Sequence, residues 1–292
     1  MSETKRKWGD RRDGVWINKT DTMHLFMPIL YPKRTGAEAV AHVDIDATAL
    51  LAYVARRNAG QTGDKYTVFH AVVAALMKTV YHRPQFNRFY KGGRLYQKKE
   101  LSAAFVAKKK FEDGAEEALM CFDCRPGENI DSIHDRIYKK LDKLRNRDKT
   151  DHATDTMAIL CRLPRPIIYF VMWILRVLDF YGKLPKALNI DDPHFCSIWL
   201  TNLGSIKLNA EYHHLNEWGT NSVFVVVGEM HKQPIVDEND QVAIHTVLPI
   251  SVTLDERITD GYYCAKTMRL LRYLLEHPEE LEKPVEEAVD FE

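Results

Sequence analysis

Residues 222–227 read Ser-Val-Phe-Val-Val-Val and place the first constraint on the fold. The run is continuously apolar, without the alternation of a strand that has one wet face, so it predicts a strand covered on both faces. Further strands are predicted at 101–108, 117–122, 197–201 and 247–254. The chain therefore needs material packed against both sides of a sheet.

Predicted helices can form one of these layers. Helices are predicted from Asp46 to just before Gly60, from the cap at Thr67 to Pro84, and over 129–147 and 260–276. The mixture of strands and long helices predicts an α/β or α+β fold. The glycine patterns of Rossmann and P-loop nucleotide sites do not occur.

Composition indicates one globular domain and excludes some partners. The 292 residues are 45% hydrophobic, and no repeat or low-complexity tract interrupts them. We expect a polar N-terminal arm over 1–24 and a single domain over 25–292. Because 41 basic residues balance 41 acidic ones, no nucleic-acid partner is expected. The charged start, Met1–Lys7, precedes no apolar signal region, so a cytoplasmic location is expected.

The five cysteines predict reduced thiols, because an odd number in a chain without a signal peptide argues against a disulfide framework. Cys121 and Cys124 have the spacing of a metal or redox pair. They lie in a predicted strand, however, where side chains three positions apart face opposite sides. No second pair completes a zinc site, so no metal is expected.

Residues 163–188 form an apolar, proline-punctuated segment. Its longest apolar run, 167–175, is too short for the roughly twenty residues that cross a bilayer. We expect a helix buried between the core and a neighbouring subunit. Two alternatives remain: one wall of an acyl-chain pocket, or a helix lying on a lipid surface, the latter suggested by flanking Arg162, Arg165, Arg176, Lys183 and Lys186.

Four segments occur in the order of a known family. Residues 254–261 read Leu-Asp-Glu-Arg-Ile-Thr-Asp-Gly, and residues 198–204 read Ile-Trp-Leu-Thr-Asn-Leu-Gly. Residues 43–50 and 67–87 complete the set. Together they resemble the catalytic domain of 2-oxoacid dehydrogenase acyltransferases and, more distantly, chloramphenicol acetyltransferase. In the segment that corresponds to residues 254–261 that family carries His-x-x-x-Asp-Gly, and here Glu256 stands at the histidine position.

The resemblance implies a chloramphenicol-acetyltransferase-like mixed sheet flanked by helices, assembled as a homotrimer with active sites between subunits. It implies a small-molecule acyl acceptor and acyl-coenzyme A as co-substrate, with no bound cofactor. Thr201 matches the hydroxyl that donates to the oxyanion, and Asp260 matches the motif aspartate. Too few residues precede Val43 for the family's lipoyl and subunit-binding domains, so no swinging-arm role is expected.

The catalytic base has three readings. Glu256 itself is the first, although deprotonating a thiol costs about 5.7 kcal/mol with an ordinary glutamate against about 2.7 with a histidine, or roughly two further decades of rate. His213 or His214, in the loop after the Thr201 strand, is the second. The third is a pseudoenzyme, retained as a trimeric binding or scaffold subunit. Asp260 would then cap the last helix, and Arg257 would pair with Asp260 or Glu256.

Overall fold

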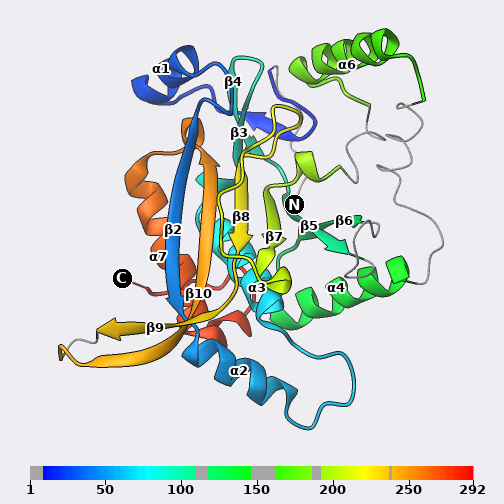
Figure 1. Cartoon of the computed structure of the whole chain (residues 1–292). Coiled ribbons are helices and arrows are strands. Elements are labelled where there is room, and N and C mark those ends of the chain that lie inside the picture. The colour runs from blue at the N-terminus through cyan, green and yellow to red at the C-terminus, as the bar shows by residue number, and fades with distance from the viewer. Residues whose placement is uncertain (1–8, 109–116, 146–161, 186–191, 237–238, 292) are drawn as a thin grey trace.

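The computed structural model describes residues 9–108, 117–145, 162–185, 192–236 and 239–291. Its main sheet has seven strands, in the order β2-β10-β8-β7-β5-β6 with β9 paired to β10 (Figure 1). The strands β5, β7 and β8 are mutually parallel and the remaining pairs are antiparallel, which confirms the predicted mixed sheet. Their bounds are β2 Glu38–Asp46, β5 Leu101–Lys108, β6 Glu117–Cys124, β7 Ile198–Asn202, β8 Val223–Val227, β9 His231–Val236 and β10 Val242–Asp255.

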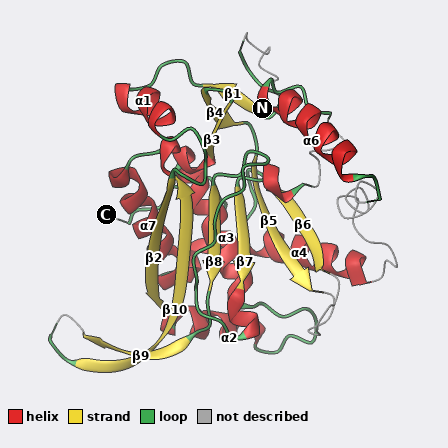
Figure 2. Cartoon of the chain, turned by 45° about the horizontal axis from the view of Figure 1, so that its top comes forward, coloured by secondary structure: helices red, strands yellow, loops and turns green. Residues whose placement is uncertain are grey.

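Four helices pack on one face of this sheet (Figure 2): α2 (Thr48–Asn58), α3 (Val68–His82), α4 (Ile130–Arg145) and α7 (Gly261–Glu276). The helix α3 is buried from His70 to Val80, because it lies between the sheet and the other helices. The capping box formed by Thr67 and His70 starts it. All four helices lie where the periodicity predicts them; residues 146–147 of the third are outside the described residues.

The strand β8 is buried on both faces, as its apolar run predicts. Val223, Val225 and Val227 belong to the main core beneath the helices. Phe224 and Val226 face the other way and join a smaller cluster with Ala210 and Leu215. The layer that covers this outer face is therefore the loop after β7, not a second set of helices.

Part of the segment expected to be a polar arm is structured. The strand β1 (Gly14–Trp16) joins β3 (Arg88–Lys91) and β4 (Arg94–Lys98) in a three-stranded sheet of order β1-β4-β3. Gly14 permits this, because a Cβ atom there would lie 2.9 Å from the Phe89 ring. The helix α1 (Thr22–Leu30) starts at the Asp21 cap. Residues 1–8 of the arm lie outside the described residues.

The apolar segment contains a helix, α6 (Arg165–Phe180), at the same end of the molecule as α1 (Figures 1 and 2). Only Asp179 of this helix is buried. Its carboxylate lies 2.8 Å from Nη2 of Arg11 and 2.7 Å from Nζ of Lys91, so the last turn of α6 is anchored to the small sheet. Residues 186–188 of the segment, with Lys186, are outside the described residues.

Candidate active site

The motif turn is held by an ion pair that spans position 256. The strand β10 ends at Asp255, and one short 3-10 turn, Glu256–Ile258, leads toward α7. Both carboxylate oxygens of Asp255 accept hydrogen bonds from Arg257, from Nε and Nη2, each at 2.8 Å. Asp255 is fully buried and Arg257 is 3% exposed. Such a bidentate pair fixes the backbone on both sides of Glu256.

Glu256 itself is half-buried, and its backbone N–H donates to Ala37 O at 2.9 Å. Among the described residues its carboxylate makes no hydrogen bond or ion pair. The sequence suggested that Arg257 would pair with Glu256 or Asp260. Its guanidinium binds the Asp255 carboxylate instead. The turn therefore presents a side chain at position 256 that the rest of the chain does not restrain.

Asp260 is the N-cap of α7. Its Oδ1 accepts from the backbone N–H of Tyr263 at 2.8 Å, and the residue is exposed. A carboxylate here also meets the positive end of the helix dipole. The motif aspartate thus orients the helix that follows position 256.

Thr201 lies far from this turn in the same chain. It alternates with Leu200 of the main core, so its side chain is on the outer face of the sheet with that of Trp199. It pairs with Val226, which pairs with Ser251, five residues before Glu256. At about 3.3 Å per residue and about 4.8 Å between strands, Thr201 and Glu256 lie on the order of 20 Å apart. A site that contains both side chains would therefore have to take Thr201 from one chain and Glu256 from another.

His213 and His214 lie in the loop over the outer face. The His213 ring stacks on Phe224 with centroids 4.2 Å apart, and His213 Nδ1 lies 3.0 Å from His214 O. The next residue, Leu215, donates its N–H to Glu38 Oε1 at 2.6 Å. Both histidines are exposed. In the part of the chain that is described, no three His, Cys, Asp or Glu side chains are placed to hold a metal ion.

The structure adds a polar chain on the outer face that the sequence did not indicate. His42 Nδ1 lies 2.9 Å from Ser251 Oγ and His42 Nε2 lies 3.1 Å from Asp44 Oδ1, beside a cavity of about 420 Å³. The Ser251 hydroxyl donates to Ala210 O and is buried. Both ring nitrogens of His42 are engaged and the hydroxyl is inaccessible, so this group orients the loop at Ala210 and lacks an available nucleophile.

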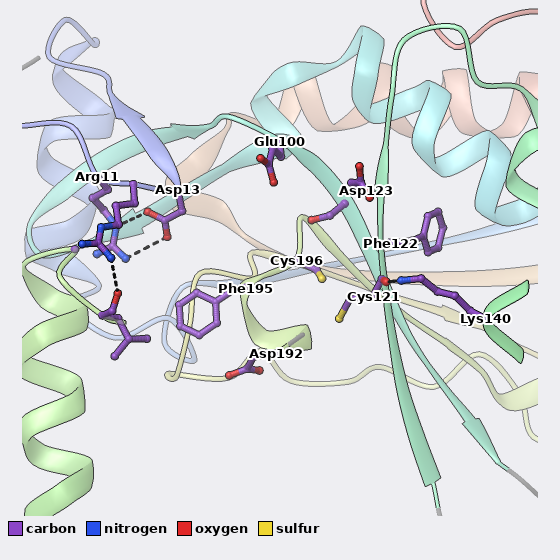
Figure 3. Close-up of a pocket in the computed structure, with 14 residues that line it drawn as sticks. Arg11, Asp13, Glu100, Cys121, Phe122, Asp123, Lys140, Asp192, Phe195 and Cys196 are labelled. Atoms are coloured by element: carbon purple, nitrogen blue, oxygen red, sulfur yellow. Dashed lines mark hydrogen bonds and ion pairs between the residues drawn. The ribbon is translucent and has the colours of Figure 1, made fainter. Parts of the chain in front are cut away.

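A pocket of about 530 Å³ lies beside β5 and β6 (Figure 3). Among the side chains that line it are those of Cys121 and Cys196, and a hydrogen bond with Cys121 lowers the pKa of the Cys196 thiol. The buried Lys98 donates to Cys196 O at 2.9 Å, and desolvation lowers its pKa to about 8. None of the five residues predicted to be catalytic lines this pocket. Cys124 is not among the residues that line it.

Comparisons with known proteins agree with this architecture. Residues 185–282 match the family model of the 2-oxoacid dehydrogenases acyltransferase catalytic domain. A probable dihydrolipoamide acetyltransferase from Listeria monocytogenes superposes with a TM-score of 0.58 and 16% identity, over 94% of this chain and 99% of that one. The fold is the acyltransferase catalytic-domain fold. Two further structures with this acyltransferase fold are dihydrolipoamide acetyltransferase from Azotobacter vinelandii (TM-score 0.57, 16% identity, 90% and 93% covered) and chloramphenicol acetyltransferase (0.53, 13%, 90% and 98%).

The comparison therefore confirms the resemblance and the fold that the sequence predicts. No curated protein sequence matches the chain. The segment that matches the acyltransferase family model includes Thr201, both loop histidines and the turn around Glu256. At these identities the structural likeness establishes the fold, and the chemistry has to be argued from the residues themselves.

Proposed function

We propose that this protein is a homotrimeric acyltransferase with active sites between subunits, in which Glu256 of one subunit and Thr201 of the next act together. The proposed reaction moves an acyl group from acyl-coenzyme A to a thiol or hydroxyl acceptor. The observation that carries the proposal is the ion pair of Asp255 and Arg257, which holds position 256 in a fixed turn with its carboxylate unpaired among the described residues.

The chemistry assigns one role to each residue. The Glu256 carboxylate accepts the proton of the acceptor thiol or hydroxyl, whose sulfur or oxygen attacks the thioester carbonyl. The Thr201 hydroxyl donates a hydrogen bond to the oxyanion of the tetrahedral intermediate. The intermediate then collapses, the carbon–sulfur bond to coenzyme A breaks, and the leaving thiolate takes the proton back from Glu256. Asp260 orients α7 and does not touch the substrate.

The separation of Thr201 and Glu256 within one chain supports a site shared between chains, and we expect the protein to sediment as a trimer. A double variant, Thr201→Cys with Glu256→Cys, should form cross-links between chains with a short bismaleimide. Because the two positions of one chain are on the order of 20 Å apart, a short reagent cannot join them internally. The wild type, treated identically, controls for the native cysteines. A monomer at micromolar concentration would remove the basis of the proposed site.

One observation favours a second function, a trimeric binding or scaffold subunit without catalysis. The base position holds a glutamate, and an ordinary carboxylate is about two decades slower than a histidine in taking a proton from a thiol. In this alternative the same assembly would be retained for its surfaces.

Binding of coenzyme A distinguishes the two functions. Calorimetric titration of the trimer with coenzyme A should show binding if the enzyme proposal holds. Thr201→Val is the matched control: it should bind coenzyme A as the wild type does but turn over more slowly, because the hydroxyl acts on the oxyanion. A folded trimer that gives no binding signal would leave the scaffold function.

A further inference from the structure

One side of α6 is an exposed apolar stripe. Phe170, Trp173, Val177 and Phe180 recur at positions i, i+3, i+7 and i+10, so they form one line along the helix. Phe170 is 61% exposed, Trp173 60% and Phe180 52%. Neither hydrophobic cluster of the described residues contains a residue of α6. We call this set of four residues the α6 stripe; a contiguous apolar surface of this kind marks an interaction site.

The opposite side of the helix sets the direction of the stripe. Ile168, Met172 and Leu175 are half-buried, and Asp179 is fully buried against Arg11 and Lys91. The body of the protein therefore anchors the last turn of α6 through Asp179. Figure 1 shows the helix at the periphery, beyond the end of the main sheet. The stripe consequently lies on the exposed side of a helix whose last turn is anchored on the other side.

The exposed charges of residues 162–185 have one sign. In residues 162–185 the only acidic side chain is Asp179, which is neutralised by its two cationic partners. Every basic side chain of this stretch is exposed: Arg162, Arg165, Arg176 and Lys183. On the helix, Arg165 and Arg176 lie along one border of the stripe. An apolar line bordered by exposed cations is complementary to an anionic lipid surface.

The dimensions suit a helix lying on a bilayer. The 16 residues of α6 span about 24 Å, less than the roughly 30 Å hydrocarbon core. Within the described residues no helix has the length and apolarity to cross a membrane. Tyr169 and Tyr181, 74% and 65% exposed, flank the stripe, and with Trp173 they have the amphipathic rings found at headgroup depth.

We propose that α6 docks this protein on an anionic lipid surface, with the α6 stripe at the boundary of headgroups and acyl chains and the four basic side chains on lipid phosphates. A second copy of α6 fits the same face less well. Antiparallel two-fold packing of two stripes would bring Arg165 and Arg176 of both copies to the same border, without an acidic side chain of residues 162–185 between them. This inference does not depend on the acyltransferase proposal, because it concerns binding alone.

Vesicle co-sedimentation of the full chain tests the inference. The protein should bind vesicles of phosphatidylglycerol and phosphatidylcholine in equal parts, bind phosphatidylcholine vesicles only weakly, and release at high salt. Phe170→Ser with Trp173→Ser should reduce binding by about tenfold or more. Arg165→Glu with Arg176→Glu should reduce it by about tenfold. These side chains are exposed, so the variants should remain folded.

Ile244→Ser is the matched control, because this side chain is 65% exposed on the β9–β10 hairpin, at the opposite end of the molecule (Figure 1). It should bind as the wild type does. Equal loss in this control, or no binding of the wild type to the mixed vesicles, would overturn the proposal. Sedimentation without lipid tests the alternative that a second copy of the chain packs on the α6 stripe. A change of oligomeric state in Phe170→Ser with Trp173→Ser would assign the stripe to that second copy instead.

Discussion

Replacing Arg257 with methionine should lower the free energy of unfolding by about 3 to 5 kcal/mol, because it leaves the Asp255 carboxylate buried without its bidentate partner. Arg34 remains nearby, but its Nε lies 3.6 Å from Asp255 and its guanidinium already donates to the carbonyls of Asn216 and Gly219. Urea unfolding at a fixed protein concentration measures the loss.

Arg272→Met is the control for Arg257→Met, because it removes the same charge from an exposed position on α7. It should change stability by less than about 0.5 kcal/mol. Combining Arg257→Met with Asp255→Asn should cost less than the sum of the two single changes, since the double variant leaves neither the Asp255 carboxylate nor the Arg257 guanidinium without its partner. A loss below about 1 kcal/mol for Arg257→Met would mean that the pair does not hold the turn.

The second large effect is expected for Glu256→His. The turn is held by its neighbours, so the new imidazole should occupy the place of the present carboxylate. Acetyl transfer from acetyl-coenzyme A to a small thiol should then rise by about a hundredfold, the difference between an ordinary carboxylate and a histidine as base. Turnover is measured by release of coenzyme A, with Thr201→Val in the same background as the control for the oxyanion contribution.

Glu256→Gln separates a working base from a residue without a catalytic role. A neutral amide cannot take the proton, so any native turnover should disappear. Stability should change by less than about 0.5 kcal/mol, because the carboxylate has no partner among the described residues to lose. A melting point clearly below that of the wild type would instead indicate a structural partner in a neighbouring subunit. No turnover in the histidine variant, together with that lower melting point, would reject the acyltransferase proposal.

Local patterns predicted most of the main sheet and the helices that cover it. The apolar run of β8 indicated a strand buried on both faces, and the spacing in α3, α4 and α7 indicated their inner sides. These predictions succeed because burial on a strand or helix repeats with the period of the element itself. The capping role of Asp260 could be predicted for the same reason, since its partner is three residues away.

The partners of individual side chains could not be predicted in this way. Glu256, Asp260 and Arg257 are close in sequence, yet Arg257 pairs with Asp255, because the end of β10 buries that carboxylate beside it. The contact of Cys121 with Cys196 and that of His42 with Ser251 join segments distant in sequence. They depend on strand order and register, which periodicity alone does not determine.

The apolar segment shows the same division between local and tertiary information. Its composition predicted a helix within 163–188 whose apolar run is too short to cross a bilayer, and the structure places that helix over 165–180. Because apolar residues lie on most of its circumference, the sequence favoured burial and did not distinguish one side from the other. The tertiary structure made that distinction: Asp179 pairs with Arg11 and Lys91, which turns Trp173 and its neighbours outward. Secondary structure was thus set by local spacing, whereas the exposed side was set by one buried carboxylate and its two cationic partners from distant segments.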